Sequence, residues 1–266
     1  MAADQKRKPD IMTDTVIAGR DGGVATVRFN RPDKKNALTM AMYDAATALL
    51  KAAAADDGVN AVLIAGTDAC FTAGNDIVDF MQNPPVTPDT PVSRFLAAVT
   101  TYDKPLVAAV EGAAVGVGTT MLLHCDLVVV AQGAKLQLPF VNLGLVPEAA
   151  SSLLLPRLAG HQRAAELLML GEPFTAEDAL GLGLANRVVP DGQAYAQAMT
   201  LAQSLAAKPP TALKLTKALM RSDPAATAAH MQAEGQHFAA QLVSPEAREA
   251  FSAFIEKRPP DFSKAS

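Results

Sequence analysis

The chain has 266 residues, of which 50% are hydrophobic and 19% charged, and its formal net charge is −4. This length and composition fit one large globular domain, or a core with a small appendage. An acidic balance without a long basic run argues against nucleic acid as a partner. The two cysteines, Cys70 and Cys125, are too few for a disulfide framework or a four-cysteine zinc site.

The sequence shows no pattern typical of a membrane span, a secretory signal or a peroxisomal signal. No apolar stretch approaches the length of a membrane-spanning helix, so we expect no membrane association. The polar start MAADQKRKPD lacks the apolar core of a secretory signal, and the final KAS differs from a peroxisomal SKL. The expected location is therefore cytoplasmic.

The first regular elements alternate between strand and helix. Residues 22–30 (GGVATVRFN) alternate and are rich in β-branched residues, which predicts a strand. After the loop RPDKKNALT, an alanine- and leucine-rich run predicts a helix over residues 40–55, capped by Thr39 or Asn36. The wholly apolar residues 61–65 predict a strand that is buried on both faces.

The same rhythm recurs further along the chain. The pattern predicts a strand over 106–110, a glycine-rich turn with a helix ending at His124, and another buried strand in DLVVVA. From Gln193 onward only helical patterns remain, interrupted by prolines. We therefore predict an α/β core with mostly parallel strands over residues 1–195, followed by a helical subdomain over 196–266.

Two glycine-containing segments could present backbone N–H groups to a ligand. In FTAGNDIVDF, Gly74 and Asn75 tolerate unusual backbone angles after a buried strand. In VEGAAVGVGTTMLLHCD, glycines precede a helix that begins near Val117, whose first N–H groups are free. Taken alone, the first segment is better explained as an ordinary strand-to-helix turn, and close helix packing also explains the glycines of the second.

A third segment, LPFVNLGLVPEAASSLLLPR, contains an acidic residue in apolar surroundings. Pro147 fits the first turn of a helix, which places Glu148 beside it. At that position Glu148 could be a helix cap, with its pKa lowered by the helix dipole. The flanking leucines could instead form an apolar pocket, which would raise its pKa.

The sequence lacks the motifs of metal-dependent enzymes and of hydrolases with a catalytic triad. The four histidines show no metal-ligand spacing, and neither a GxSxG nor an HExxH motif is present. We therefore expect no metal site and no hydrolytic triad.

Taken together and in order, several segments resemble the crotonase (enoyl-CoA hydratase/isomerase) superfamily. They are FNRPDKKNALT, CFTAGNDI, KPLVAAVEGAAVGVG, CDLVVVA, LPFVNLGLVPEA, GEPFTAEDALGLGLANRVV and FSAFIEKRPPDF, which span residues 22–262. The resemblance implies an α/β spiral of ββα units and a C-terminal helical trimerisation region. It also implies acyl-CoA substrates, no cofactor other than the coenzyme A of the substrate, and assembly into a homotrimer or a dimer of trimers.

The resemblance assigns roles to individual residues. The backbone N–H groups of Asn75 and Val117 correspond to an oxyanion hole, which would stabilise the charge on a thioester enolate. The positions that match contacts with CoA or the acyl group are Lys34, Lys35, Ala37, Ala73, Gly74, Asp76, Ile77 and Lys257, with Arg258 as a further cation near the phosphates.

Two departures from the family pattern distinguish between hydratase and isomerase activity. Hydratases of this superfamily have two glutamates, and their positions correspond to Thr120 and Phe140, neither of which is acidic. Glu148 instead resembles the single acidic residue of peroxisomal-type Δ3,Δ2-enoyl-CoA isomerases. One carboxylate suffices to move a proton from C2 to C4. The favoured expectation is isomerisation of 3-enoyl-CoA to trans-2-enoyl-CoA with Glu148 as catalytic residue.

Two alternatives stay open. The first is a hydratase or another lyase of the superfamily that uses Glu148 unconventionally, with Asp79 and Glu111 as spare acids that are otherwise expected on solvated surfaces. The second is a non-catalytic binding protein on the same scaffold, including an RNA-binding variant, which the acidic net charge disfavours.

Overall fold

The computed structural model describes residues 14–264 apart from residues 68, 86, 88 and 222. Its strands are β1 (Val16–Asp21), β2 (Val24–Phe29), β3 (Ala61–Gly66), β4 (Leu106–Val110), β5 (Ala113–Val115), β6 (Leu127–Ala131), β7 (Lys135–Gln137), β8 (Phe174–Thr175) and β9 (Arg187–Val189). Its α-helices are α1 (Met40–Ala55), α2 (Ile77–Gln82), α3 (Pro91–Thr100), α4 (Val117–Thr120), α5 (Ser151–Ala159), α6 (His161–Ala165), α7 (Ala176–Gly181), α8 (Ala194–Ala206), α9 (Pro210–Met220), α10 (Pro224–Leu242) and α11 (Pro245–Glu256).

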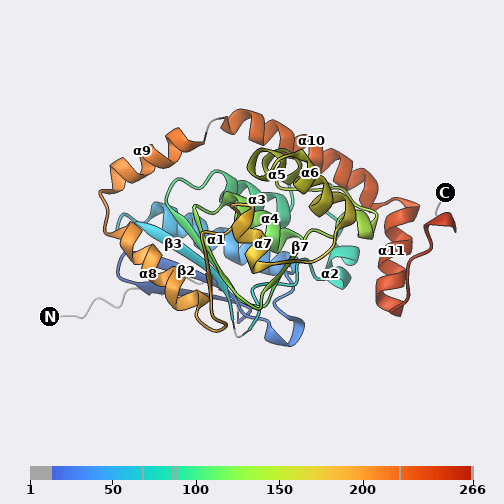
Figure 1. Ribbon diagram of the computed structural model, residues 1–266, viewed down its shortest axis with the longest axis horizontal. Coiled ribbons are helices and arrows are strands. Elements are labelled where there is room, and N and C mark those ends of the chain that lie inside the picture. Colours follow the sequence, from blue (N-terminus) through green and yellow to red (C-terminus); the bar gives the residue numbers. More distant parts are fainter. Residues whose placement is uncertain (1–13, 68, 86, 88, 222, 265–266) are drawn as a thin grey trace.

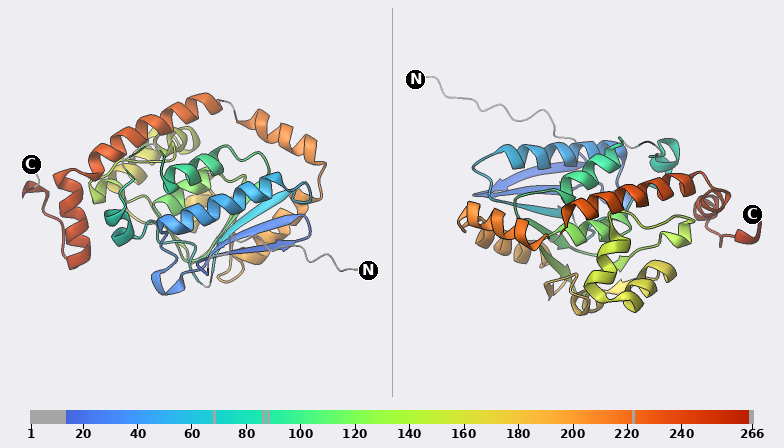
Figure 2. Two further views of the ribbon diagram at one scale, coloured as in Figure 1. Left: turned by 180° about the vertical axis from the view of Figure 1, so that it is seen from behind. Right: turned by 90° about the horizontal axis from the view of Figure 1, so that it is seen from above.

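The main sheet has the strand order β1-β2-β3-β4-β6-β9, and only the β1–β2 pair is antiparallel. Helix α1 lies against one face of this sheet and α8 against the other (Figure 2). Every residue of β4 is buried, as the apolar run predicted. The α/β core with mostly parallel strands is therefore confirmed.

Two sequence predictions match the structure closely because local chemistry determines them. Helix α1 has the predicted bounds, and the Thr39 hydroxyl caps it by accepting from Met42 N–H at 3.3 Å. Asn36 does not cap this helix; its amide donates to the Cys70 carbonyl at 2.7 Å.

A smaller sheet, ordered β5-β7-β8, lies next to the functional segments. Strand β5 pairs in parallel with β7, and β7 pairs antiparallel with β8. Because β5 ends at Val115, it leads the chain directly into Gly116 and α4.

The C-terminal helices extend over and beyond the core. In Figure 1, α9 and α10 arch over the sheet, α10 passes beside α5, and α11 lies at one end of the molecule. Helix α8 packs on the main sheet, so it belongs spatially with the core. The division of the chain at residue 196 and the role of α9–α11 in trimerisation stay predictions. None of the described helices is long and apolar enough to cross a membrane.

Candidate active site

The segment after β3 brings Asn75 next to β5 and the loop before α1. Isolated bridges pair Leu38 with Asn75 and Thr72 with Ala114. Gly74 has φ +88, and a Cβ built there would lie 2.8 Å from the Val115 carbonyl oxygen. Only glycine therefore fits this approach, which fixes the direction of the next peptide N–H.

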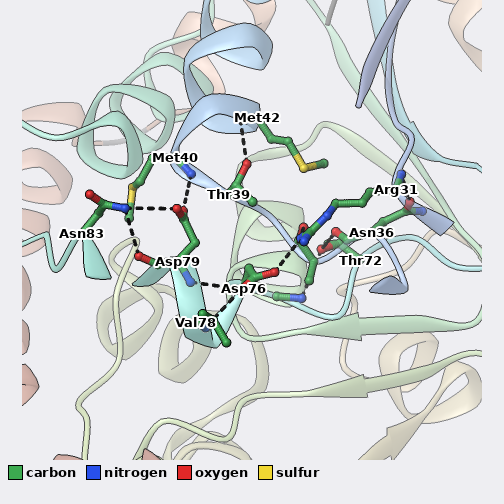
Figure 3. A network of polar contacts seen from close by, with 12 residues as sticks. Arg31, Asn36, Thr39, Met40, Met42, Thr72, Asp76, Val78, Asp79 and Asn83 are labelled. Carbon is green, nitrogen blue, oxygen red and sulfur yellow. Dashed lines mark hydrogen bonds and ion pairs between the residues drawn. The ribbon is translucent and has the colours of Figure 1, made fainter. Parts of the chain in front are cut away.

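A polar network fixes the same segment from both sides (Figure 3). Arg31 contacts the Asp76 carboxylate at 2.6 Å, and the other oxygen of Asp76 accepts from the N–H groups of Val78 and Asp79, which caps α2. Partial burial opposes ionisation of Asp76, but these hydrogen bonds outweigh it and lower its pKa. The Thr72 hydroxyl donates to the Asn36 carbonyl at 2.7 Å. These contacts leave little freedom in the backbone around Asn75.

Two backbone N–H groups near this segment have no acceptor in the part of the chain that the structure describes. Gly116, at φ +55, precedes Val117, the first residue of α4. Among the described residues, no acceptor contacts the N–H of Val117 or of Asn75. Both residues line a cavity of about 570 Å³, which we call the Val117 cavity. Two unpaired donors at one cavity suit an oxyanion.

Glu148 lies in a second cavity of about 360 Å³, the Glu148 cavity, lined by side chains of α3 and α10. The Glu148 cavity shares the lining residues Asn75, Phe80 and Phe238 with the Val117 cavity. The carboxyl group and the two N–H groups therefore face adjoining spaces.

The environment of Glu148 raises its pKa to about 7, because burial disfavours the charged form. The Thr120 hydroxyl donates to Oε1 of Glu148 at 2.5 Å and opposes this effect, while the charge of Glu234 adds to it. Thr120 and Val117 lie one turn apart on α4, so a single turn of helix links the carboxyl to the second N–H.

The prediction that Glu148 lies in the first turn of a helix is wrong. Helix α5 begins at Ser151, and both Ala149 and Ala150 have left-handed backbone angles, with φ of 58° and 57°. Glu148 therefore precedes the helix, so the effect of burial dominates over that of a helix dipole.

The residues expected to contact CoA or the acyl group divide into two sets. The Val117 cavity is lined by Lys34, Ala37, Ala73, Gly74, Asn75, Asp76 and Ile77. Lys35 and Lys257 are absent from its described lining. Both have positive φ: Lys35 follows the short 3-10 helix Pro32–Lys34, and Lys257 follows α11. Arg258 forms ion pairs with Glu249 and Glu256.

The positions of the two hydratase glutamates have different surroundings. Thr120 contacts Glu148, whereas the Phe140 ring is buried and lines the Val117 cavity. The spare acids have structural contacts and are half-buried rather than solvated. Asp79 accepts from Met40 N–H at 2.7 Å, and Glu111 accepts from the N–H groups of Gly192 and Ala194.

Three site residues escaped the sequence analysis in this role: Thr120 as the partner of Glu148, Tyr43, and Glu234. The buried Tyr43 hydroxyl donates to the Asn75 side-chain oxygen at 2.5 Å. Glu234 is the single acid of α10, and this isolation within an alanine-rich helix was a usable signal. Tyr43 had no such signal, because a tyrosine on an apolar helix face is usually a core residue.

Comparisons with known proteins identify the family of the chain. The family model described as enoyl-CoA hydratase/isomerase matches residues 19–265. Enoyl-CoA delta isomerase 2 of Rattus norvegicus is 32% identical over 92% of this chain, which spans 64% of that relative's length. The 2,3-dehydroadipyl-CoA hydratase of Escherichia coli K12 is 33% identical over 93% of this chain and 98% of its own.

Solved structures show the same architecture. Pseudomonas aeruginosa OdaA has a TM-score of 0.89 at 48% identity and covers 91% of this chain and 99% of its own. Carnitinyl-CoA hydratase from Mycobacterium avium has a TM-score of 0.87 at 31% identity, and the match covers 95% of this chain and 100% of its own. They confirm the crotonase-like α/β fold, and the match of the family model over nearly all of the sequence shows that the chain belongs to the enoyl-CoA hydratase/isomerase family.

Proposed function

We propose that the protein isomerises 3-enoyl-CoA to trans-2-enoyl-CoA with Glu148 as the single proton carrier. The observation that supports this most is the solitary carboxyl. Among the residues described as lining the two cavities, the acids are Glu148 and Asp76, and Asp76 is engaged by Arg31 and by the start of α2. Hydration through two carboxylates would need a second free acid, and the described lining of the two cavities does not provide one.

The arrangement suggests how the substrate binds. The thioester oxygen would accept from the N–H groups of Asn75 and Val117, with the acyl chain in the Glu148 cavity and CoA along the Val117 cavity towards Lys34. A donor of this kind contributes about 3 kcal/mol to the transition state in comparable sites.

The chemistry follows from one base. The Glu148 carboxylate removes a proton from C2, the electrons move into a dienolate whose oxygen lies between the two donors, and the same carboxyl returns the proton to C4. No electron is gained or lost overall, so the reaction needs no cofactor beyond the CoA of the substrate. A pKa of about 7 places the carboxyl close to the value at which it can both accept and return a proton.

A second function, hydration of 2-enoyl-CoA, is favoured by the likeness to the E. coli hydratase, which matches over 98% of its length. In this case Glu148 would activate a water molecule without a second carboxylate. A cytoplasmic location and a trimeric assembly stay predictions beside either function.

The test offers 3-hexenoyl-CoA and crotonyl-CoA to the wild type, Glu148→Gln and the exposed control Glu246→Gln. We expect the wild type and the control to convert 3-hexenoyl-CoA, and Glu148→Gln to lose at least about 10³-fold in kcat, because its amide cannot accept the C2 proton. Rapid hydration of crotonyl-CoA that survives Glu148→Gln would contradict the proposal. Binding of CoA esters without turnover of either would point to the non-catalytic scaffold.

A further inference from the structure

The two residues after Glu148 adopt a backbone conformation that alanine seldom shows. Ala149 and Ala150 have φ of 58° and 57°, in the left-handed region where Cβ crowds the following carbonyl. Both alanines are almost fully buried. Nothing in their side chains favours this turn, so contacts from elsewhere must maintain it.

The contacts come from α10, about eighty residues further along the chain. Glu234 is 7% exposed, and its Oε2 accepts from Ala150 N–H at 2.6 Å. Its Oε1 accepts from Ser152 N–H at 3.0 Å and from the Ser152 hydroxyl at 2.5 Å. Figure 1 shows α10 running beside α5, which makes this reach possible.

Two histidines complete the arrangement. Since the single hydroxyl proton of Ser152 goes to Glu234, the hydroxyl oxygen accepts from Nε2 of His230 at 2.8 Å. On the other side, Nε2 of His124 lies 2.8 Å from the Ala149 carbonyl and donates to it. Burial lowers the pKa of His124 to about 4, so this ring is neutral.

We propose that Glu234 is a positioning residue for Glu148: its carboxylate fixes Ala150 and Ser152, and the resulting left-handed turn directs the Glu148 carboxyl into its cavity. A helix of the C-terminal region thereby determines the geometry of a base located in the core. The kinetic part of this proposal rests on the proposed isomerase function, whereas the geometry does not.

Electrostatics adds a second consequence. The groups that face Glu148 are the Thr120 hydroxyl of α4, the Tyr43 hydroxyl of α1 and the Glu234 carboxylate of α10, with His124 and His230 beyond the turn. Burial is the main cause of the raised pKa of Glu148, and the negative charge of Glu234 raises it further. Removing that charge should therefore lower the pKa of Glu148.

The test uses Glu234→Gln, which keeps the shape of the side chain but removes its charge and replaces one acceptor oxygen by an NH₂ group. We expect kcat for 3-hexenoyl-CoA to fall about 10²-fold with KM changed less than about threefold, because a misplaced base reacts slowly. The acid limb of the kcat/KM profile should move to lower pH. The exposed Glu246→Gln, at the start of α11, should match the wild type in both readouts.

A direct readout separates this proposal from the reaction itself. In protein labelled with ¹³C at the glutamate carboxyl, the Glu148 resonance is the one missing from Glu148→Gln, and its titration midpoint should be lower in Glu234→Gln than in the wild type. An unchanged midpoint together with unchanged kcat would overturn the positioning role. If the wild type converts no 3-hexenoyl-CoA, the proposed function fails, and an unchanged midpoint in Glu234→Gln is then by itself the result that overturns the role of Glu234.

A milder variant covers the case in which Glu234→Gln does not fold. Ser152→Ala removes one of the three hydrogen bonds to Glu234 and leaves the charge in place. We expect a several-fold lower kcat, with the ¹³C midpoint of Glu148 near that of the wild type. A kcat equal to that of the wild type in a folded Ser152→Ala protein would overturn the proposal.

Discussion

The Glu148 carboxyl is a base whose strength depends on two opposing features of its surroundings. Burial raises its pKa to about 7, and the hydrogen bond from Thr120 to Oε1 limits the increase. Because only the carboxylate can remove a proton, activity is present above the pKa and lost as the pH falls through it. We therefore expect kcat/KM for 3-hexenoyl-CoA to decline below about pH 7.

Replacing Thr120 by valine should shift this decline. Thr120→Val keeps the shape of the side chain but removes a hydrogen bond that favours the charged form, so the pKa of Glu148 should rise by about one unit. The measurement is the pH profile of kcat/KM, with the exposed Thr216→Val as control. A profile that overlays the wild type would show that the Thr120 hydroxyl does not tune the base.

At the scale of elements, the site depends on backbone geometry more than on side-chain identity. The loop that carries Asn75 and the turn before α4 each contain a glycine at positive φ, Gly74 and Gly116. Since the proposed donors are peptide N–H groups, a small rotation of either peptide would misdirect them.

Gly74→Ala tests this dependence. The added Cβ would meet the Val115 carbonyl oxygen at 2.8 Å, and φ +88 is unfavourable for alanine. We expect kcat/KM to fall about 10²-fold or more, as for the loss of one oxyanion donor. Gly181→Ala, which meets no atom within 4 Å, is the matched control. Full activity in a folded Gly74→Ala protein would exclude a strict role for this peptide.

Local chemistry explains which elements the sequence could predict. Helix α1 and strand β4 were predicted with their observed bounds, because a Thr cap and a fully apolar run specify them locally. The start of α5 was predicted too early. Pro147 suggested a first turn, but the left-handed Ala149–Ala150 turn intervenes, and it is maintained by Glu234 from α10. A contact between residues that distant leaves no local pattern.

At the scale of the whole molecule, the site combines parts from the entire chain. The loop before α1, the segment after β3, the start of α4, the segment before α5 and side chains of α10 all contribute to the two cavities. The resemblance to the crotonase superfamily implied that the N–H groups of Asn75 and Val117 lie together, and the flanking leucines offered an apolar pocket around Glu148 as an alternative to a helix cap. The sequence could not predict the contact with Thr120, which depends on how α4 and the segment before α5 pack.

The central claim, a single half-buried carboxyl that moves one proton from C2 to C4, can be tested with 3-hexenoyl-CoA carrying two deuterons at C2. In ordinary water, a shuttle by Glu148 that is faster than exchange with solvent should transfer the removed deuteron to C4. A substantial part of the product should then keep both deuterons by mass spectrometry, with the second located at C4 by NMR. A product that always loses one deuteron and carries only solvent hydrogen at C4 would contradict the account.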